Sequence, residues 1–412
     1  MTELLVEYAF FITSAILIAG FIASIMLNKF GIPDSMFLIG LGILIGPVLR
    51  LLPPSEFLGL APYIGALAFV AIMFESSLGI NVHELIETAR HATILAILTF
   101  FSSLIASTLF VHLLLNRSLM EGILFGSIIG GSSSAVIAAI APKVGLNSFV
   151  QLIVSLESIL SDVFCVVSTI VVLTIMTSPP SMTPGQIGGY VASKFCVSIV
   201  LGFVFGLILL NILYRVKRYK HVYTATLAAL IFLYALAEFL RGSGAVSVLI
   251  AGIILSNFEH LPFSLTTKRE TGTLKFQRVF LESFHSELTL LIKVFFYVEV
   301  GLVFTVHNPL NLIVALILSV LLLAVRYPNA LLVSTMAKLR NATPTITVFY
   351  ARGLSAAVLA FLPALHGIPN ARFYTESASG IVVITNVILT LSYWFIKRRS
   401  QYRPSYYFPW RE

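Results

Sequence analysis

Apolar runs of roughly 20 residues recur along the whole chain, and they limit the possible folds more than any other feature of the sequence. A helix of about 20 apolar residues is long enough to cross the hydrocarbon core of a bilayer. Of the 412 residues, 58% are hydrophobic and 11% are charged, whereas soluble domains carry about 25% charged residues. No soluble core could bury so many apolar runs. The sequence therefore predicts an all-α protein that crosses a membrane many times.

We expect about thirteen membrane-spanning helices. The range 309–337 is long and is interrupted by Pro328. The acidic start, with Glu3 and Glu7 before the first run, predicts a retained first helix and not a cleaved signal peptide. The predicted spans lie near residues 8–28, 34–50, 62–79, 91–115, 120–141, 149–177, 187–213, 221–240, 243–257, 284–306, 309–337, 343–364 and 375–396.

Basic residues are distributed unevenly over the predicted connectors. With the N-terminus outside, the inner connectors contain eighteen Lys and Arg residues and the outer connectors contain four. This asymmetry follows the positive-inside rule. It predicts a multi-pass protein of the cell membrane with an outside N-terminus and a short basic cytoplasmic tail at residues 397–412. It also explains the net charge of +8 without a nucleic-acid partner.

Sequence patterns of cofactor and enzyme sites are absent. The two cysteines, Cys165 and Cys196, lie in apolar runs and form neither a disulfide framework nor a Cys/His cluster. The glycines of residues 40–46 lack the strand–turn–helix context of a nucleotide-binding fingerprint. An intramembrane aspartyl protease would need two carboxylates in a Gly-x-Gly-Asp context. We therefore expect a protein that is not an enzyme and has no cofactor and no nucleotide-binding domain.

An internal repeat links the fifth and twelfth predicted spans. Gly131–Ala139 and Gly353–Phe361 share Gly, Ser, Ala, Val and Ala at five of nine positions. The two spans run in opposite directions, as inverted-topology repeats do, and such segments often form discontinuous helices at a binding site in the membrane midplane. Chance is the alternative explanation, because membrane helices reuse small residues. We favour inverted repeats with discontinuous, crossing helices in these two spans.

Eight charged residues lie within the predicted spans, where a charge at the bilayer centre costs roughly 2.5–3.5 kcal/mol. The two signs are equally represented, which indicates internal pairing. The acids are Glu75, Glu157, Asp162 and Glu299, and the bases are Lys194, Lys293, Arg326 and Arg352.

Asp162 is the strongest candidate for a working group. On a helix it shares one face with Ser155, Ser158, Cys165 and Thr169. Hard cations prefer oxygen ligands, and one buried aspartate can hold either a proton or a cation, which is a physical basis for exchange. The alternative is that the hydroxyls only mediate helix packing.

The remaining charges have supporting roles in this interpretation. We expect Arg352 to form a structural ion pair with Glu157, which leaves Asp162 free to titrate. Glu75 lies near a span end and carries less weight. The secondary candidates are Glu75, Lys293, Arg326 and Ser355.

Several segments resemble the monovalent cation:proton antiporter superfamily, which includes sodium/proton and potassium/proton exchangers. The resemblance covers essentially the whole chain, and Ala237–Asn257 is its most specific segment. The other similar segments are Ile32–Pro47, Phe74–Leu78, Lys293–Leu302, Arg326–Pro328 and Ala351–Gly353.

Glu157-Ser-Ile-Leu-Ser-Asp162 is similar to the Glu-Ser-x-x-Asn-Asp motif of the electroneutral branch. The resemblance implies that Asp162 is the ion-binding carboxylate, that Ser158 is a ligand, and that Glu157 and Arg352 are a supporting pair. It also implies a homodimer whose core moves like an elevator. The dimerisation part would comprise about 1–88 and 180–306, and the core transport part about 89–179 and 307–396.

Two departures from the family pattern concern the ion. Ser161 replaces the Asn of the motif, and Ser132-Ser133-Ser134 replaces Thr-Asp-Pro, so one carboxylate is missing. The triplet looks more like the Ser-Ser-Thr of potassium-efflux relatives. The expected site is thus a monovalent cation, Na⁺ or K⁺, at Asp162 with Ser132, Ser133, Ser158 and Ser161, exchanged for one proton. A passive cation channel and a transport-dead sensor on the same fold remain alternatives.

Overall fold

The structure is a computed structural model that describes residues 2–30, 33–49, 61–78, 85–144, 147–178, 183–215, 222–257, 287–302 and 309–401. Within these ranges all regular secondary structure is helical. Most of the predicted basic tail, from residue 402 onward, lies outside the described residues.

Helices occupy part of every predicted span. The helix of residues 287–302 corresponds to the tenth predicted span. The other helices are α1 (Thr2–Phe30), α2 (Asp34–Ile43) with a π-helical turn η1 (Leu44–Val48), α4 (Ala61–Leu78), α5 (Leu85–Leu114), α6 (Leu119–Ile129), α7 (Ser134–Ile140) with η2 (Ala141–Val144), α8 (Ser148–Thr177), α9 (Pro184–Arg215), α10 (Val222–Phe239), α11 (Gly244–Ser256), α13 (Pro309–Met336), η4 (Arg340–Ala342), α14 (Thr343–Val348), α15 (Leu354–Leu359), α16 (Leu362–Leu365) and α17 (Ala371–Gln401).

Six of these helices are long and apolar enough to cross a membrane, counted over the described residues. They are α5, α8, α9, α10, α13 and α17. Shorter apolar helices accompany them in α1, α2, α4, α6, α11 and the region of α15 and α16. The predicted multi-pass, all-helical fold is confirmed by this set. One detail differs: α13 continues through Pro328 without a break.

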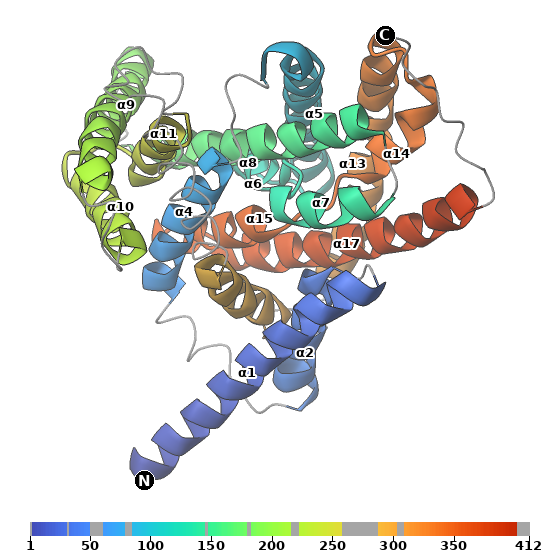
Figure 1. Ribbon diagram of the computed structural model, residues 1–412, viewed down its shortest axis with the longest axis horizontal. Coiled ribbons are helices and arrows are strands. Elements are labelled where there is room, and N and C mark those ends of the chain that lie inside the picture. Colours follow the sequence, from blue (N-terminus) through green and yellow to red (C-terminus); the bar gives the residue numbers. More distant parts are fainter. Residues whose placement is uncertain are drawn as a thin grey trace.

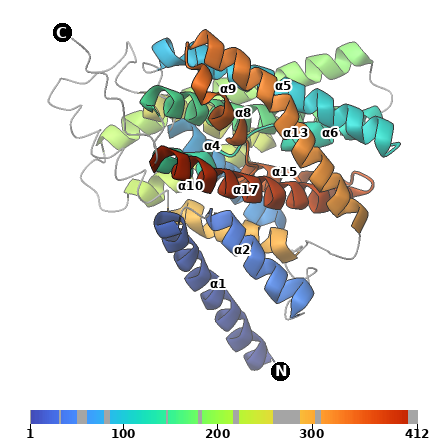
Figure 2. The same ribbon diagram turned by 90° about the vertical axis from the view of Figure 1, so that its right-hand side faces the viewer.

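The helices form two groups around a central layer. Helices α9, α10 and α11 contact one another at one side of the molecule, and α4 packs against α11 (Figure 1). On the opposite side, α5 packs against α6, α8 and α13. Between these groups lie α8, α15 and α17 (Figures 1 and 2). The central layer carries the polar residues described below.

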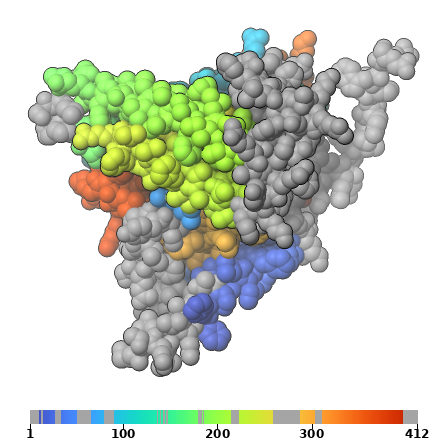
Figure 3. Space-filling model, turned by 60° about the vertical axis from the view of Figure 1, so that its left-hand side comes forward, coloured from blue at the N-terminus to red at the C-terminus, as the bar shows by residue number. Residues whose placement is uncertain are grey.

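Helix α1 projects from the body of the molecule (Figures 1 and 2) and appears in blue at the edge of the space-filling view in Figure 3. Its exposed side chains include Phe10, Phe11 and Phe21. Helix α2 packs tightly on the helix of residues 287–302, since a Cβ on Gly42 would lie 2.2 Å from the carbonyl oxygen of Val298. Small residues at such crossings let membrane helices approach closely.

Candidate functional site

Two stretches of non-helical chain meet in the central layer. The first, residues 130–133, separates α6 from α7, and the second, residues 349–353, separates α14 from α15. The backbone N–H of Ser133 donates a hydrogen bond to the carbonyl oxygen of Ala351, with a donor–acceptor distance of 2.8 Å. A Cβ on Gly353 would lie 2.0 Å from the Ser133 hydroxyl oxygen, so this close approach requires glycine.

Asp162 lies on α8 beside this junction and is 3% exposed. Its Oδ2 accepts hydrogen bonds from the Ser134 hydroxyl at 2.6 Å and from the Ser134 backbone N–H at 3.2 Å. Its Oδ1 accepts a hydrogen bond from the Ser355 hydroxyl at 2.5 Å. Helices α7 and α15 therefore each supply one hydroxyl to the carboxylate, one from each member of the sequence repeat.

No basic side chain forms an ion pair with Asp162 among the residues that the structure describes, where ion pairs join Arg117 with Glu121 and Arg326 with Glu157. The carboxylate is stabilised by neutral donors only. Each serine hydroxyl also carries two lone pairs, and it can rotate to present them to a cation in place of its proton. This arrangement of a carboxylate with hydroxyl oxygens suits a hard cation or a proton.

Glu157 is the second buried carboxylate on α8, and it forms an ion pair with Arg326 of α13. Arg326 Nη1 and Nη2 donate to the two carboxylate oxygens at 3.0 and 2.8 Å, and both side chains have 0% exposure. Arg326 Nε also donates to the carbonyl oxygen of Ile346 at 3.0 Å. Such bidentate charge-assisted pairs are strong and directional, so Glu157 is held as a neutralised, structural group.

The predicted ion pair between Glu157 and Arg352 is therefore wrong. The backbone of Arg352 is fixed by α17, because its N–H donates to Thr385 Oγ1 at 3.0 Å and its carbonyl accepts from Asn386 Nδ2 at 2.8 Å. Its guanidinium donates through Nη1 to the carbonyl oxygen of Tyr350 at 3.0 Å. Arg326 therefore takes the place beside Glu157 that the sequence analysis assigned to Arg352.

The predicted serines divide into two networks. Ser132 donates its hydroxyl hydrogen to Glu157 Oε1 at 2.8 Å, and its backbone N–H donates to the Ser161 hydroxyl at 3.1 Å. Ser133 caps α7 by accepting a hydrogen bond from the Val136 N–H. These three side chains therefore support the junction and do not contact Asp162.

Ser158, the ligand implied by the family motif, is buried one turn before Asp162 and donates to the carbonyl oxygen of Ser155 at 2.8 Å. Ser355, a secondary candidate in the sequence, bonds Asp162 directly. The sequence analysis missed Ser134. The Ser132–Ser134 triplet indicated that this segment belongs to the site. Which of the three hydroxyls faces the Asp162 carboxylate depends on the residue at which α7 begins.

The other secondary candidates lie around this centre. Glu75 on α4 is half-buried, and α4 contacts α8, the helix that carries Asp162. Lys293, on the helix of residues 287–302, is half-buried and forms no ion pair within the described part of the chain. Glu299 on the same helix is 1% exposed, and neither carboxylate oxygen has a hydrogen-bond partner among the described residues.

A buried carboxylate beside two interrupted helices, in a multi-pass membrane protein, is the architecture of a secondary transporter. The sequence profile for the transmembrane region of the sodium/hydrogen exchanger family matches residues 14–396. The chain therefore belongs to this family, and its resemblance to the monovalent cation:proton antiporter superfamily is confirmed.

Relatives of known function and structure agree with this membership. The Na(+)/H(+) antiporter 1 of Methanocaldococcus jannaschii is 25% identical over 302 residues, which cover 69% of this chain and 66% of that protein, just under two thirds of its length. The solved structure of the sodium proton antiporter MjNhaP1 from the same organism at pH 8 has a TM-score of 0.74 and 21% identity, with 96% of this chain and 97% of that chain covered. A second structure of MjNhaP1 has a TM-score of 0.75. These structures share the fold of this chain.

Proposed function

We propose that this protein is a secondary antiporter that exchanges a monovalent cation for protons, and that Asp162 carries both. The observation that supports this most is that the buried Asp162 carboxylate has only neutral hydrogen-bond donors and no ion-pair partner among the described residues. Membership of the sodium/hydrogen exchanger family and the antiporter relative point to the same activity.

In this mechanism, proton and cation compete for one carboxylate. The protonated Asp162 is neutral and needs no further compensation. When the proton leaves, a cation binds the carboxylate together with the hydroxyl oxygens of Ser134 and Ser355, which turn their lone pairs toward it. Ser158 and the carbonyl groups freed by the two helix breaks are further candidate ligands, and Glu75 flanks the site.

The stoichiometry we propose is one cation for one proton. Arg326 neutralises Glu157 through two hydrogen bonds, so in this proposal Asp162 is the carboxylate of the site that exchanges a proton for a cation. A single proton replaced by a single monovalent cation moves no net charge, which makes the exchange electroneutral. The cation is Na⁺ or K⁺.

The movement we propose is that of an elevator. The core transport part, about 89–179 and 307–396, would carry Asp162 past a dimerisation part formed by about 1–88 and 180–306. The thirteen predicted spans, the crossing of the two interrupted helices at the membrane midplane, the homodimer and the outside N-terminus all belong to this proposal. The exposed phenylalanines of α1 offer an apolar surface for lipid or for the second subunit.

The test is proton flux in proteoliposomes, monitored by dequenching of a pH-sensitive dye after addition of Na⁺, K⁺ or Li⁺. We expect wild type to respond to Na⁺ or K⁺ and Asp162→Asn to lose the response. Glu299→Gln is the matched control, because it neutralises a buried carboxylate that does not contact Asp162. Retained exchange in Asp162→Asn would refute the site, and cation flux without proton movement would indicate a channel.

A further inference from the structure

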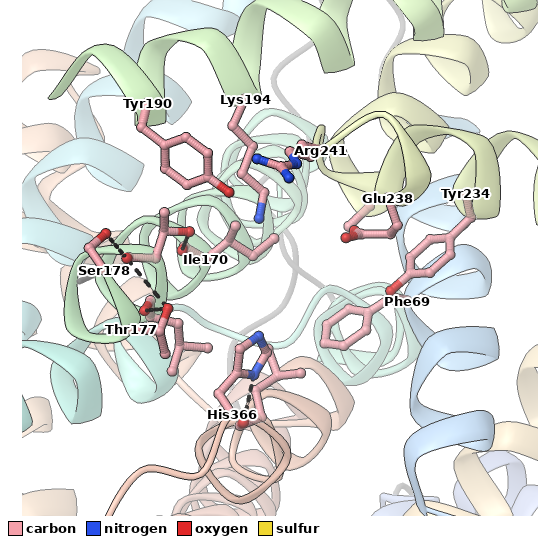
Figure 4. A pocket seen from close by; sticks show the side chains of 14 residues that line it. Phe69, Ile170, Thr177, Ser178, Tyr190, Lys194, Tyr234, Glu238, Arg241 and His366 are labelled. Carbon is pink, nitrogen blue, oxygen red and sulfur yellow. Dashed lines mark hydrogen bonds between the residues drawn. The ribbon is translucent and has the colours of Figure 1, made fainter. Parts of the chain in front are cut away.

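A cavity of about 400 Å³ lies at some distance from Asp162, at the far end of α8 (Figure 4). Its wall includes Ile170 and Thr177, which lie eight and fifteen residues beyond Asp162 on α8. At 1.5 Å per residue, these positions are about 12 and 22 Å from Asp162 along the helix axis. The cavity is therefore separate from the site at the helix breaks.

The cavity is formed equally by both proposed parts of the transporter. Helices α4, α9, α10 and α11, with the turn after α10, provide seven of its fourteen lining residues, and α8 with the region of α16 provides the other seven. A ligand in this cavity would contact the dimerisation part and the core transport part at the same time.

Basic side chains dominate the charged groups of the wall. Lys194 of α9 points into the cavity beside Tyr190, and Arg241 lies next to it in the turn after α10 (Figure 4). Neither forms an ion pair with a carboxylate within the described ranges. The one acidic lining residue, Glu238, directs Oε1 to the backbone N–H of Gly244 at 2.8 Å. Two cations consequently remain available to an anion.

The polar donors around these cations suit the oxygens of a phosphate group. Tyr190 contributes a hydroxyl, and His366 faces Lys194 from the opposite wall (Figure 4). Lysine and arginine bind phosphate through charge-assisted hydrogen bonds, which are roughly twice as strong as neutral ones. The same cations would repel Na⁺ or K⁺, so the cavity is unsuited to hold the transported cation.

Apolar side chains also line the cavity. They include Phe69 of α4, Leu173 of α8 and Leu362 of α16. A cavity with cations near hydroxyls and an apolar wall matches an amphiphile that carries a phosphate head group and a hydrocarbon chain. We propose that this cavity binds the phosphate group of an anionic phospholipid, and that the bound lipid holds the two parts of the transporter together and slows exchange.

Binding is tested on the purified full-length protein by native mass spectrometry with phosphatidylglycerol and phosphatidylcholine of identical acyl chains. We expect preferential retention of phosphatidylglycerol by wild type. The double variant Lys194→Gln/Arg241→Gln should weaken this retention about tenfold or more, since two charge-assisted contacts are lost. Arg372→Gln, which removes an exposed arginine that does not line the cavity, is the matched control and should bind as wild type does.

Competition with inorganic phosphate distinguishes binding of a phosphate group alone from binding of a whole phospholipid. Displacement of phosphatidylglycerol by inorganic phosphate would show that the head group alone is recognised, and persistence of the lipid would show that the acyl chain contributes; both results support a phosphate site. Equal retention of the two lipids by wild type, or unchanged retention in the double variant, would overturn the proposal.

The effect on transport rests on the proposed antiport and is measured separately. In phosphatidylcholine vesicles we expect wild type and the double variant to exchange at similar rates. Adding phosphatidylglycerol should slow wild type and leave the double variant unchanged. An equal response of both proteins would contradict the locking role. A complete lack of exchange in every vesicle would count against the antiport function, while the binding experiment would still decide the lipid site.

Discussion

The backbone N–H of Ser133 donates a 2.8 Å hydrogen bond to the carbonyl oxygen of Ala351, and this bond joins the two interrupted helical stretches directly. The chain segments are more than 200 residues apart in the sequence, yet each satisfies a backbone group that its own helix leaves free. Asp162 is bonded on both sides of this junction. Four predictions follow from the geometry around it and elsewhere in the fold.

Gly353→Ala should abolish exchange and lower the thermal midpoint of the purified protein. The new methyl group would lie 2.0 Å from Ser133 Oγ and 2.5 Å from Ser133 Cβ, so the junction would have to separate. Gly40→Ala is the matched control, because a Cβ there has no atom within 4 Å. Exchange at the wild-type rate in Gly353→Ala would show that the contact is dispensable.

Ser134→Ala and Ser355→Ala should each raise the cation concentration for half-maximal exchange by about five- to tenfold, since each removes a hydroxyl oxygen that turns toward the cation in the proposed mechanism. This change corresponds to about 1–1.4 kcal/mol. Maximal rates should change less than this affinity. Ser168→Ala is the control, because that hydroxyl bonds only carbonyl oxygens of α8. Titration of Na⁺ and K⁺ in proteoliposomes measures the effect, and unchanged half-maximal concentrations in both variants would exclude these serines as ligands.

Arg326→Gln should destabilise the fold by about 3–5 kcal/mol, because it leaves the buried Glu157 carboxylate without its partner. The double variant Glu157→Gln/Arg326→Gln should recover a large part of this loss. A cycle of single and double variants, followed by thermal unfolding in detergent, measures the coupling. Combining Glu157→Gln with Arg352→Gln serves as the comparison, and stronger coupling in that pair than in the first would contradict the observed ion pair.

Glu299→Met should raise stability by about 1–3 kcal/mol, because the variant removes a buried polar group that has no hydrogen-bond partner among the described residues. Methionine has a similar length and flexible packing. Glu299→Gln, which keeps a polar group in the same place, should give no such gain. A lower unfolding midpoint for Glu299→Met than for wild type would reveal a partner for this carboxylate.

The apolar runs were sufficient to predict where the helices lie, and helical periodicity singled out Asp162 as the candidate site residue. Asp162 stood out because a lipid-facing helix would not place a carboxylate on one face with several hydroxyls. The sequence repeat likewise marked both segments that meet at the junction, since Gly131 and Gly353 begin matching stretches. Both features depend only on the spacing of residues along the chain, so they can be recognised in the sequence without the structure.

Contacts between side chains of different helices could not be predicted from the spacing of residues along the sequence. Arg326 and Arg352 are both arginines within predicted spans, and only the folded arrangement, which brings the Arg326 side chain of α13 to Glu157 of α8, decides between them. The choice of Ser134 over Ser133 depends on where α7 begins, which changes the direction of each hydroxyl by about 100° per residue. Pro328 also lies within the continuous helix α13, which packs against α5 and α17.

The hydrogen bond between Ser133 and Ala351 has a consequence for the energetics of transport. Ser134 and Ser355, which bond Asp162, belong to the helices that this link connects, so the carboxylate and its oxygen neighbours form one unit. When such a unit changes the side of the membrane to which it opens, its coordination shell travels with it, and the intrinsic affinity for the ion is the same on both sides. For the proposed antiport, we therefore expect similar half-maximal cation concentrations whether the cation is supplied from one side of the membrane or from the other.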